Sequence, residues 1–357
     1  MPITALKASV CSLPVPTASI ARVHHGGNLD EAIAAHPNAP KPWIDLSTGI
    51  NPTPYPFPSL PSDAWSRLPT ATQEHDLIEA AARCYGVDNP AGIVASPGTQ
   101  ALIQIIPKLV KAPAEVAILG PTYAEHAHCW NASGHRVRII TSLTDIGQAN
   151  VVICVNPNNP TGAMTPPASL HNIAQHLHDT DGLLVVDEAF ADTMPEISLA
   201  SACPPGTLVL KSFGKFYGLA GLRLGFAIGA SSTCSQLKAM LGPWAISGPA
   251  IQIGKRALSD DVWRQETIQQ LIRSRDHLTQ LLTSAGMKPI GITPLFQLIS
   301  HPQAAQLAAT LGASGIHVRT FEDHPTWLRF GLPGPDSAWL RLQRVLQTFA
   351  QTAHQET

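Results

Sequence analysis

The feature that most constrains the fold is an alternation of short apolar runs with helical segments between residues 90 and 230. The apolar runs are rich in β-branched residues and lie at 116–119, 137–140, 151–155, 183–186, 207–210 and 226–228. Helices are expected between them, at 99–111, 168–178 and 232–241. Apolar strands that alternate with helices are typical of a parallel sheet covered on both faces. The sequence therefore predicts an α/β fold with a mostly parallel central sheet flanked by helices.

The pattern changes after Pro249. Residues 250–285 carry leucine and isoleucine at helical spacing, and short strands are then expected at 295–299, 316–319 and 328–331, with helices at 303–312 and 337–350. This pattern predicts a smaller α+β C-terminal domain at 250–357, after a large domain at 41–249. Residues 1–40 lack a strong periodicity and are expected to form an N-terminal arm that packs on another surface.

Composition narrows the function classes. The 357 residues are 13% charged with a formal net charge of −2, which argues against a nucleic-acid partner. The six cysteines form no CxxC pair, which favours reduced thiols in a cytoplasmic protein, and no metal is expected. Pro14 and Pro16 interrupt the mildly apolar stretch at 8–21, which disfavours a signal peptide. No run of about 18 apolar residues occurs, so no membrane span is expected.

The segment at 212–225 carries the strongest chemical signal. Lys215 follows an expected buried strand, lies among glycines and precedes Arg223 by eight residues. A buried lysine can lose its proton and attack an aldehyde, and an arginine can bind a phosphate through two parallel hydrogen bonds. On spacing alone, a surface lysine on a flexible loop is an equally acceptable interpretation.

Four other segments place polar residues at expected strand ends or helix starts, where open α/β sheets form their sites. They are 96–100, which opens a helix, 120–123, which ends in Tyr123, 155–162, which contains Asn159, and 183–190, in which Asp187 ends an apolar strand. Backbone N–H groups at a helix start can bind phosphate. Each segment alone also has a structural interpretation, as a turn, a core tyrosine or an aspartate that caps the next loop.

Taken together, the order of these segments resembles the fold-type I, aspartate-aminotransferase-like enzymes, which use pyridoxal 5′-phosphate (PLP). The resemblance covers about residues 24–345, nearly the whole chain. It implies that Lys215 forms a Schiff base with the cofactor and that Asp187 pairs with the protonated pyridine nitrogen, so that these two residues are catalytic. It also implies that Asn159 hydrogen-bonds the phenolic oxygen and that Tyr123 stacks on the ring. The residues implied to hold the cofactor phosphate are Gly98, Thr99, Gln100, Ser212 and Arg223.

Within that superfamily the chain is similar to the histidinol-phosphate aminotransferase group and, more narrowly, to the L-threonine-O-3-phosphate decarboxylases. The likeness rests on His25-Gly26-Gly27-Asn28 and on the segment Asp-Leu-Ser-Thr-Gly-Ile-Asn-Pro at 45–52. In that family the first belongs to an arm at the active site, and the second lines the substrate pocket. The substrate-binding residues implied are His25, Gly26, Gly49, Arg319 and Arg329. The resemblance assigns Arg329 to the α-carboxylate and Arg319 to the substrate phosphate, although either arginine alone is compatible with a surface salt bridge.

Three positions depart from the wider group. Phe190 stands where a tyrosine often donates a second hydrogen bond to the phenolic oxygen of the cofactor. Leu68 stands where a tyrosine often reaches the cofactor phosphate of the partner subunit, and Gly214 replaces a phosphate-binding serine. These changes leave the lysine, aspartate and asparagine in place and weaken a plain aminotransferase assignment.

The resemblance implies decarboxylation of L-threonine O-3-phosphate to (R)-1-amino-2-propanol O-2-phosphate for cobalamin biosynthesis. The substrate is then a phosphorylated amino acid, and the enzyme is expected to be a cytoplasmic homodimer with its sites at the subunit interface. Two alternatives stay open. One is a PLP-dependent aminotransferase of the histidinol-phosphate type. The other is a non-catalytic binding protein with this fold, against which the intact Lys215 argues.

Overall fold

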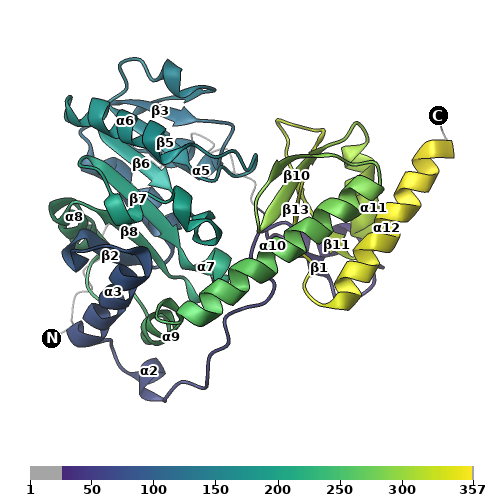
Figure 1. Cartoon of the computed structure of the whole chain (residues 1–357), viewed down its shortest axis with the longest axis horizontal. Helices are drawn as coiled ribbons and strands as arrows, with labels where there is room; N and C mark the ends of the chain where they lie inside the picture. Colours follow the sequence, from purple (N-terminus) through teal and green to yellow (C-terminus); the bar gives the residue numbers. More distant parts are fainter. Residues whose placement is uncertain (1–25, 356–357) are drawn as a thin grey trace, which may run out of the picture.

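The computed structural model describes residues 26–355, and Figure 1 shows their arrangement. The strands are β1 (Ile44–Asp45), β2 (Ile93–Ser96), β3 (Glu115–Leu119), β4 (Arg136–Ile140), β5 (Val151–Val155), β6 (Leu183–Asp187), β7 (Thr207–Ser212), β8 (Gly225–Gly229), β9 (Pro289–Ile292), β10 (Phe296–Ser300), β11 (Ile316–His317), β12 (Arg319–Thr320) and β13 (Trp327–Gly331). The helices are α1 (Leu29–Ala35), α2 (Asp63–Ser66), α3 (Ala71–Tyr85), α4 (Thr99–Ile105), α5 (Ala124–Ala132), α6 (Pro167–His178), α7 (Phe213–Phe216), α8 (Ser231–Leu241), α9 (Gly248–Leu258), α10 (Asp261–Ser284), α11 (Ala304–Ala313) and α12 (Asp336–Gln355).

A seven-stranded sheet forms the larger part, in the order β2-β8-β7-β6-β5-β3-β4. All neighbouring pairs are parallel except those of β8, which runs antiparallel to both β2 and β7. The strands β3, β5, β6 and β7 therefore end at the same edge of the sheet. The mostly parallel sheet that the sequence predicts is confirmed.

Helices cover both faces of this sheet, and each face has its own core. Val152 of β5 packs on the side that holds buried residues of α3 and α6, whereas the adjacent Ile153 packs on the side that holds buried residues of α4, α5 and α8. Every residue of β5 is buried. This two-sided burial explains why the strand is apolar throughout.

A second, four-stranded antiparallel sheet in the order β12-β13-β10-β9 lies beside the first, together with α11 and α12 (Figure 1). The long helix α10 runs from the large sheet to the small one. The short strand β1 pairs in parallel with β11, so residues 44–45 lie with the C-terminal sheet although they precede the large one in sequence. This crossing brings the segment at 45–52 to the boundary between the two sheets.

The structure corrects several expected element bounds. The helix expected at 99–111 ends at Ile105 and continues as a 3₁₀ turn at Ile106–Leu109, because Pro107 has no N–H to donate to an α-helix. The helical sequence at 250–285 is two helices, separated where the Asp260 side chain accepts a hydrogen bond from the N–H of Trp263 at 3.0 Å. The first of them, α9, contains residue 250 and packs against α3 on the large sheet. The strands β1, β2 and β9 are additional to those expected.

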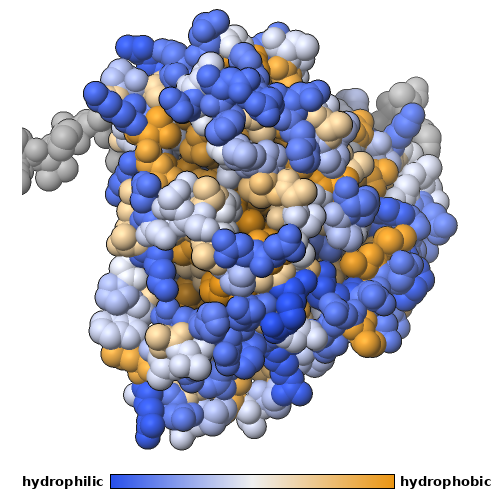
Figure 2. Space-filling model, turned by 60° about the vertical axis from the view of Figure 1, so that its left-hand side comes forward, coloured by the Kyte–Doolittle hydropathy of each residue, from blue (hydrophilic) through white to orange (hydrophobic). Residues whose placement is uncertain are grey.

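On the face that Figure 2 shows, hydrophobic residues lie mainly in hollows and in small patches between hydrophilic ones. Among the described residues, no helix is both long and apolar enough to cross a membrane.

Candidate active site

A cavity of about 640 Å³ opens at the shared edge of β3, β5, β6 and β7 and is closed on its other side by residues of the C-terminal sheet. Its walls come from segments that are far apart in the sequence. The residues singled out from the sequence that line it are Gly26, Gly98, Thr99, Gln100, Tyr123, Asn159, Asp187, Ser212, Lys215, Arg223, Arg319 and Arg329. The volume lies in the range of small-molecule sites, which span about 300–1,000 Å³.

Lys215 lines the cavity, whereas Lys211, four residues earlier in the chain, does not, and the surroundings of the two lysines differ. The Lys215 Nζ donates to the backbone oxygen of Thr48 at 3.0 Å, and burial followed by repulsion from Arg329 lowers its pKa to about 8. Burial alone would also lower the pKa of Lys211, but the carboxylates of Glu188 and Asp192 outweigh it and raise that pKa. Lys215 is therefore the residue whose amine can act as a nucleophile near neutral pH.

Asp187 presents a buried carboxylate at the end of β6. One oxygen accepts from the N–H of Ala189 at 3.0 Å, and the other lies 2.9 Å from Nε2 of His126. The residue is 3% exposed, so its hydrogen bonds fix the direction of the carboxylate rather than leaving it to solvent. Such a carboxylate can hold a proton on a nitrogen base placed in the cavity.

The wall at the start of α4 is shaped to bring a guanidinium close to the backbone. Gly98 has φ +83, and a Cβ there would lie 2.7 Å from a terminal nitrogen of Arg223. A Cβ on Gly225 would likewise lie 2.7 Å from the backbone nitrogen of Thr99. Ser212, the last residue of β7, lines the same part of the cavity. The arginine, the serine hydroxyl and the backbone N–H groups offer donors for an anion such as phosphate.

Tyr123 lies on the cavity wall at the start of α5. Its hydroxyl donates to Oε1 of Gln100 at 3.0 Å, and Nε2 of Gln100 donates to a carboxylate oxygen of Glu125 at 2.6 Å. Burial raises the pKa of Tyr123. The hydroxyl therefore fixes the position of the ring on the cavity wall.

Arg329 is 5% exposed and is clamped between two parts of the site. One terminal nitrogen donates to Oδ1 of Asn159 and the other to the backbone oxygen of Ser47, and the guanidinium lies 5.0 Å from the Phe296 ring centroid. Its Nε is buried with no hydrogen-bond partner in the described part of the chain. Burial and the nearby Arg319 lower the pKa of Arg329. A buried cation with an unused donor is suited to bind a carboxylate.

Arg319 lines the mouth of the same cavity, together with Phe321, Glu322 and His324 of the loop before β13. Burial lowers its pKa, and the Glu322 carboxylate opposes that effect. The Arg319 guanidinium lies 5.4 Å from the Phe321 ring centroid. The cavity therefore holds a second cation that can meet a second anionic group of a ligand.

Of the remaining expected substrate residues, Gly49 is placed differently, Gly26 lines the cavity and His25 is not described. Gly49 does not line the cavity: it has φ +63, and a Cβ there would lie 3.2 Å from the Phe190 ring and 3.3 Å from the Phe296 ring. Its conformation and close packing account for the glycine without a ligand contact. Gly26 lines the cavity where the chain passes directly over the Ser47 backbone oxygen. His25 lies outside the described residues.

The three departures from the family pattern lie in distinct surroundings. The Phe190 ring centroid is 5.4 Å from the Lys215 Nζ. Leu68 is 64% exposed on a different surface of the molecule. A Cβ on Gly214 would lie 2.8 Å from Cα of Ala220, so a serine there would require the 220 loop to move.

His126 is a site residue that the sequence did not reveal. It is 1% exposed on α5 and contacts Asp187 from 61 residues away. The one available signal was its position three residues after Tyr123, on the helix that begins at the strand end.

The fold and this cavity define a class. The chain belongs to the aminotransferase class I and II family, whose profile matches residues 42–342. Within that class it is similar to a threonine-phosphate decarboxylase of Sinorhizobium sp, with 43% identity over 89% of this chain and 95% of the relative. It is also similar to a threonine-phosphate decarboxylase of Pseudomonas aeruginosa, with 41% identity over 93% of this chain and 100% of the relative. A histidinol-phosphate aminotransferase of Lactiplantibacillus plantarum is 25% identical over 80% of this chain and 83% of its own length.

Solved structures share the fold. A histidinol-phosphate aminotransferase from Sinorhizobium meliloti in complex with pyridoxal 5′-phosphate superposes with a TM-score of 0.78 at 22% identity, over 96% of this chain and 99% of the other. An L-threonine-O-3-phosphate decarboxylase from Porphyromonas gingivalis superposes with a TM-score of 0.67 at 19% identity, over 80% of this chain and 94% of the other. These likenesses establish the fold-type I architecture that the sequence predicts.

Proposed function

We propose that this protein is a PLP-dependent lyase that decarboxylates L-threonine O-3-phosphate to (R)-1-amino-2-propanol O-2-phosphate, a step of cobalamin biosynthesis. The observation that carries the proposal is the identity of 43% and 41% with two threonine-phosphate decarboxylases over nearly the full length of each. The cavity supports it, because one nucleophilic lysine and three arginines line the same space.

The residues present fit the cofactor. In the proposed arrangement the Lys215 amine would hold the cofactor through its aldehyde, Asp187 would keep a proton on its ring nitrogen, and Tyr123 would support its ring. The guanidinium of Arg223, held against Gly98, binds its phosphate with Thr99, Gln100 and Ser212. When bound, PLP supplies a carbonyl that condenses with amines and a ring that accepts electrons from a breaking Cα bond.

The chain's own residues then orient the substrate and move one proton. Arg329 binds the α-carboxylate of the substrate through its Nε, which has no other partner in the described part of the chain. Arg319 binds the substrate phosphate at the mouth of the cavity. Asn159, which already accepts from Arg329, ties the carboxylate site to the cofactor site. After CO2 leaves, the Lys215 amine is placed to return a proton to Cα.

An aminotransferase of the histidinol-phosphate type is the second candidate, because relatives of that name align with 25% identity over most of the chain. The two functions differ in substrate and in their need for an amino acceptor. The test is to incubate the PLP-loaded enzyme with threonine phosphate alone, and separately with histidinol phosphate plus 2-oxoglutarate. The proposal expects turnover only in the first reaction. Turnover only in the second assigns the chain to the aminotransferases instead.

A homodimer is part of the proposal. An apolar hollow of about 680 Å³ on the large domain is lined by Trp65, Leu68 and Trp244, which are 70%, 64% and 55% exposed. Large exposed apolar side chains that cluster in this way are typical of a protein interface. A solution mass equal to one chain would contradict the dimer.

The low pKa of Lys215 has a direct consequence for cofactor loading. The amine is reactive only when unprotonated, so the rate at which apoenzyme forms a borohydride-reducible adduct with PLP is expected to rise with pH and level off above about 8. Stopped-flow absorbance between pH 6 and pH 10 measures this rate, and free lysine amide provides the reference curve. A midpoint above about 10, near that of an ordinary lysine, would contradict the assigned environment.

Phe190 is predicted to tune the cofactor. A hydroxyl at this position would donate to the phenolic oxygen of the cofactor and stabilise its anion. This lowers the pKa of the protonated nitrogen that would link the cofactor to Lys215. Phe190→Tyr is therefore expected to shift the pH midpoint of the cofactor absorbance downward. The matched control is Phe321→Tyr, which places the same hydroxyl at the cavity mouth. Coincident titrations of Phe190→Tyr and the wild type would refute the prediction.

Arg319 is predicted to recognise the substrate phosphate. Loss of one charge-assisted contact amounts to about 1.5–3 kcal/mol, so Arg319→Ala should reduce turnover of threonine phosphate by roughly ten- to a hundredfold. Free threonine should be a poor substrate for both proteins, with little further loss in the variant. Arg344→Ala, on the exposed side of α12, is the control. Equal losses for threonine and threonine phosphate would show that Arg319 does not contact the phosphate.

A further inference from the structure

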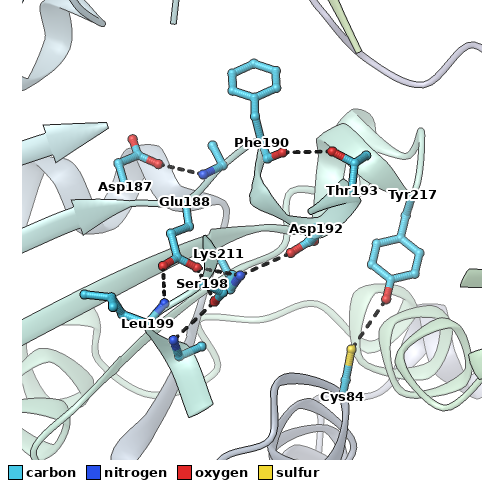
Figure 3. Close-up of polar contacts among 12 residues, drawn as sticks. Cys84, Asp187, Glu188, Phe190, Asp192, Thr193, Ser198, Leu199, Lys211 and Tyr217 are labelled. Atoms are coloured by element: carbon cyan, nitrogen blue, oxygen red, sulfur yellow. Dashed lines mark hydrogen bonds and ion pairs between the residues drawn. The ribbon is translucent and has the colours of Figure 1, made fainter. Parts of the chain in front are cut away.

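A buried group of charged side chains lies behind the active site, on the other side of the large sheet from Asp187 (Figure 3). The Lys211 Nζ lies 2.7 Å from Oε2 of Glu188 and 3.5 Å from Oδ1 of Asp192. The side chains of Lys211 and Glu188 are 3% and 0% exposed. None of the three lines the cavity, so the proposed reaction does not use them directly.

Glu188 uses both carboxylate oxygens. Its Oε1 accepts from the N–H of Leu199 at 2.7 Å, and its Oε2 accepts from the hydroxyl of Ser198 as well as from Lys211. These bonds close the chain from 188 to 199 into a loop fastened at one point (Figure 3). Phe190, whose ring lies beside the Lys215 amine, stands at the start of that loop, and its backbone oxygen accepts from the hydroxyl of Thr193 at 3.2 Å.

The ion pair joins the two strands that carry the reactive groups. Glu188 directly follows Asp187, and their side chains point to opposite sides of the sheet (Figure 3). Lys211 lies on β7, four residues before Lys215, and the N–H of Glu188 donates to the backbone oxygen of Leu210 at 2.9 Å. The pair therefore fastens the ends of β6 and β7 together, directly behind the carboxylate and the amine that face the cofactor.

Stability alone does not account for this arrangement. Removing two charges from water is expensive, and apolar residues of similar volume often stabilise a core as well as a buried ion pair does. Burial raises the pKa of Asp192, and its Oδ2 is buried with no hydrogen-bond partner in the described part of the chain. The directional contacts between Lys211 and Glu188 are therefore better suited to fixing a geometry than to adding stability.

We propose that Lys211 and Glu188 are a positioning pair that sets the distance and orientation of Asp187 and Phe190 relative to Lys215. The inference rests on the proposed function in one respect, because its readout requires that PLP be bound. It does not depend on whether the chain is a decarboxylase or an aminotransferase.

The test compares Lys211→Met with Lys211→Arg, which restores the charge, and with Lys255→Met as a matched control. Lys255 also forms a 2.7 Å ion pair, with Asp76, but at the surface. The measurements on each holoenzyme are the pH midpoint of the cofactor absorbance and the rate at which the cofactor dissociates. Unfolding temperatures are recorded alongside, so that a loss of stability is seen separately.

Without the pair, Asp187 would hold the proton on the cofactor ring nitrogen less well. Because that positive charge is then smaller, the pKa of the nitrogen that joins the cofactor to Lys215 should rise. Lys211→Met is therefore expected to shift the midpoint upward by about one pH unit and to speed cofactor dissociation about tenfold. Lys211→Arg should lie close to the wild type, and Lys255→Met should be unchanged in both measurements.

A purely structural pair gives a different result: Lys211→Met would unfold at a lower temperature while its midpoint and dissociation rate stay at the wild-type values, and this outcome would overturn the proposal. If Lys211→Met does not fold, Glu188→Gln decides the question, because it keeps the volume and loses the charge. The same upward shift supports the positioning role, and an unchanged midpoint contradicts it. A wild-type protein that takes up no PLP contradicts the proposed function itself, so the two failures are distinguishable.

Discussion

Replacing Lys215 by alanine should abolish covalent attachment of the cofactor and reduce turnover by about 10⁴-fold, because the variant loses both the nucleophile and the proton donor. Borohydride reduction followed by peptide mapping measures the attachment, and the wild type should carry the label on Lys215 alone. Lys211 is an internal comparison in the same peptide, since its two carboxylate partners keep it cationic. A label on Lys211, or retained turnover in Lys215→Ala, would refute the assignment. Lys255→Ala serves as the control for removing a lysine.

Replacing Arg329 by lysine should have the second-largest effect. The guanidinium spans Asn159 and Ser47, and its Nε is a buried donor with no hydrogen-bond partner in the described part of the chain. An ammonium cannot replace all three of these donors. Truncating one partner of a buried charged pair amounts to about 2–5 kcal/mol, so kcat/KM for threonine phosphate should fall by roughly 30- to 4,000-fold.

A crossed binding measurement separates this loss from misfolding. The product amine lacks the carboxylate but keeps the phosphate. Arg329→Lys should therefore weaken binding of the substrate and leave binding of the product nearly unchanged, whereas Arg319→Ala should weaken both. The KM for threonine phosphate and a calorimetric titration of each holoenzyme with the product provide the two values. Equal weakening of substrate and product in Arg329→Lys would show that Arg329 does not bind the carboxylate.

The sequence was sufficient for the features that local patterns encode. The apolar run at 151–155 predicts a strand because a strand buried on both faces leaves no polar alternation, and β5 has these bounds. Asp187, Asn159 and Lys215 could be singled out because each follows such a strand, and the three line one cavity because parallel strands bring their carboxyl ends to one edge. The four-residue β2 and the proline- and glycine-containing β9 have too weak a pattern to be recognised from composition.

Features that depend on contacts between distant segments could not be predicted. Nothing near His126 indicates that it reaches Asp187, and the pairing of residues 44–45 with β11 is visible only after the chain has folded. Gly49 was expected in the substrate pocket, yet its packing against Phe190 and Phe296 joins three separate segments. The role of Lys211 likewise depends on Glu188, a residue on another strand.

The most direct test of the account is the fate of the substrate carboxylate. The PLP-loaded enzyme is given threonine phosphate labelled with ¹³C at the carboxylate, with no 2-oxo acid present, and CO2 and aminopropanol phosphate are quantified together. The account predicts equal amounts of labelled CO2 and of the amine, with many turnovers per active site in the absence of an amino acceptor. A requirement for a 2-oxo acid, with formation of glutamate from 2-oxoglutarate and no labelled CO2, would contradict it.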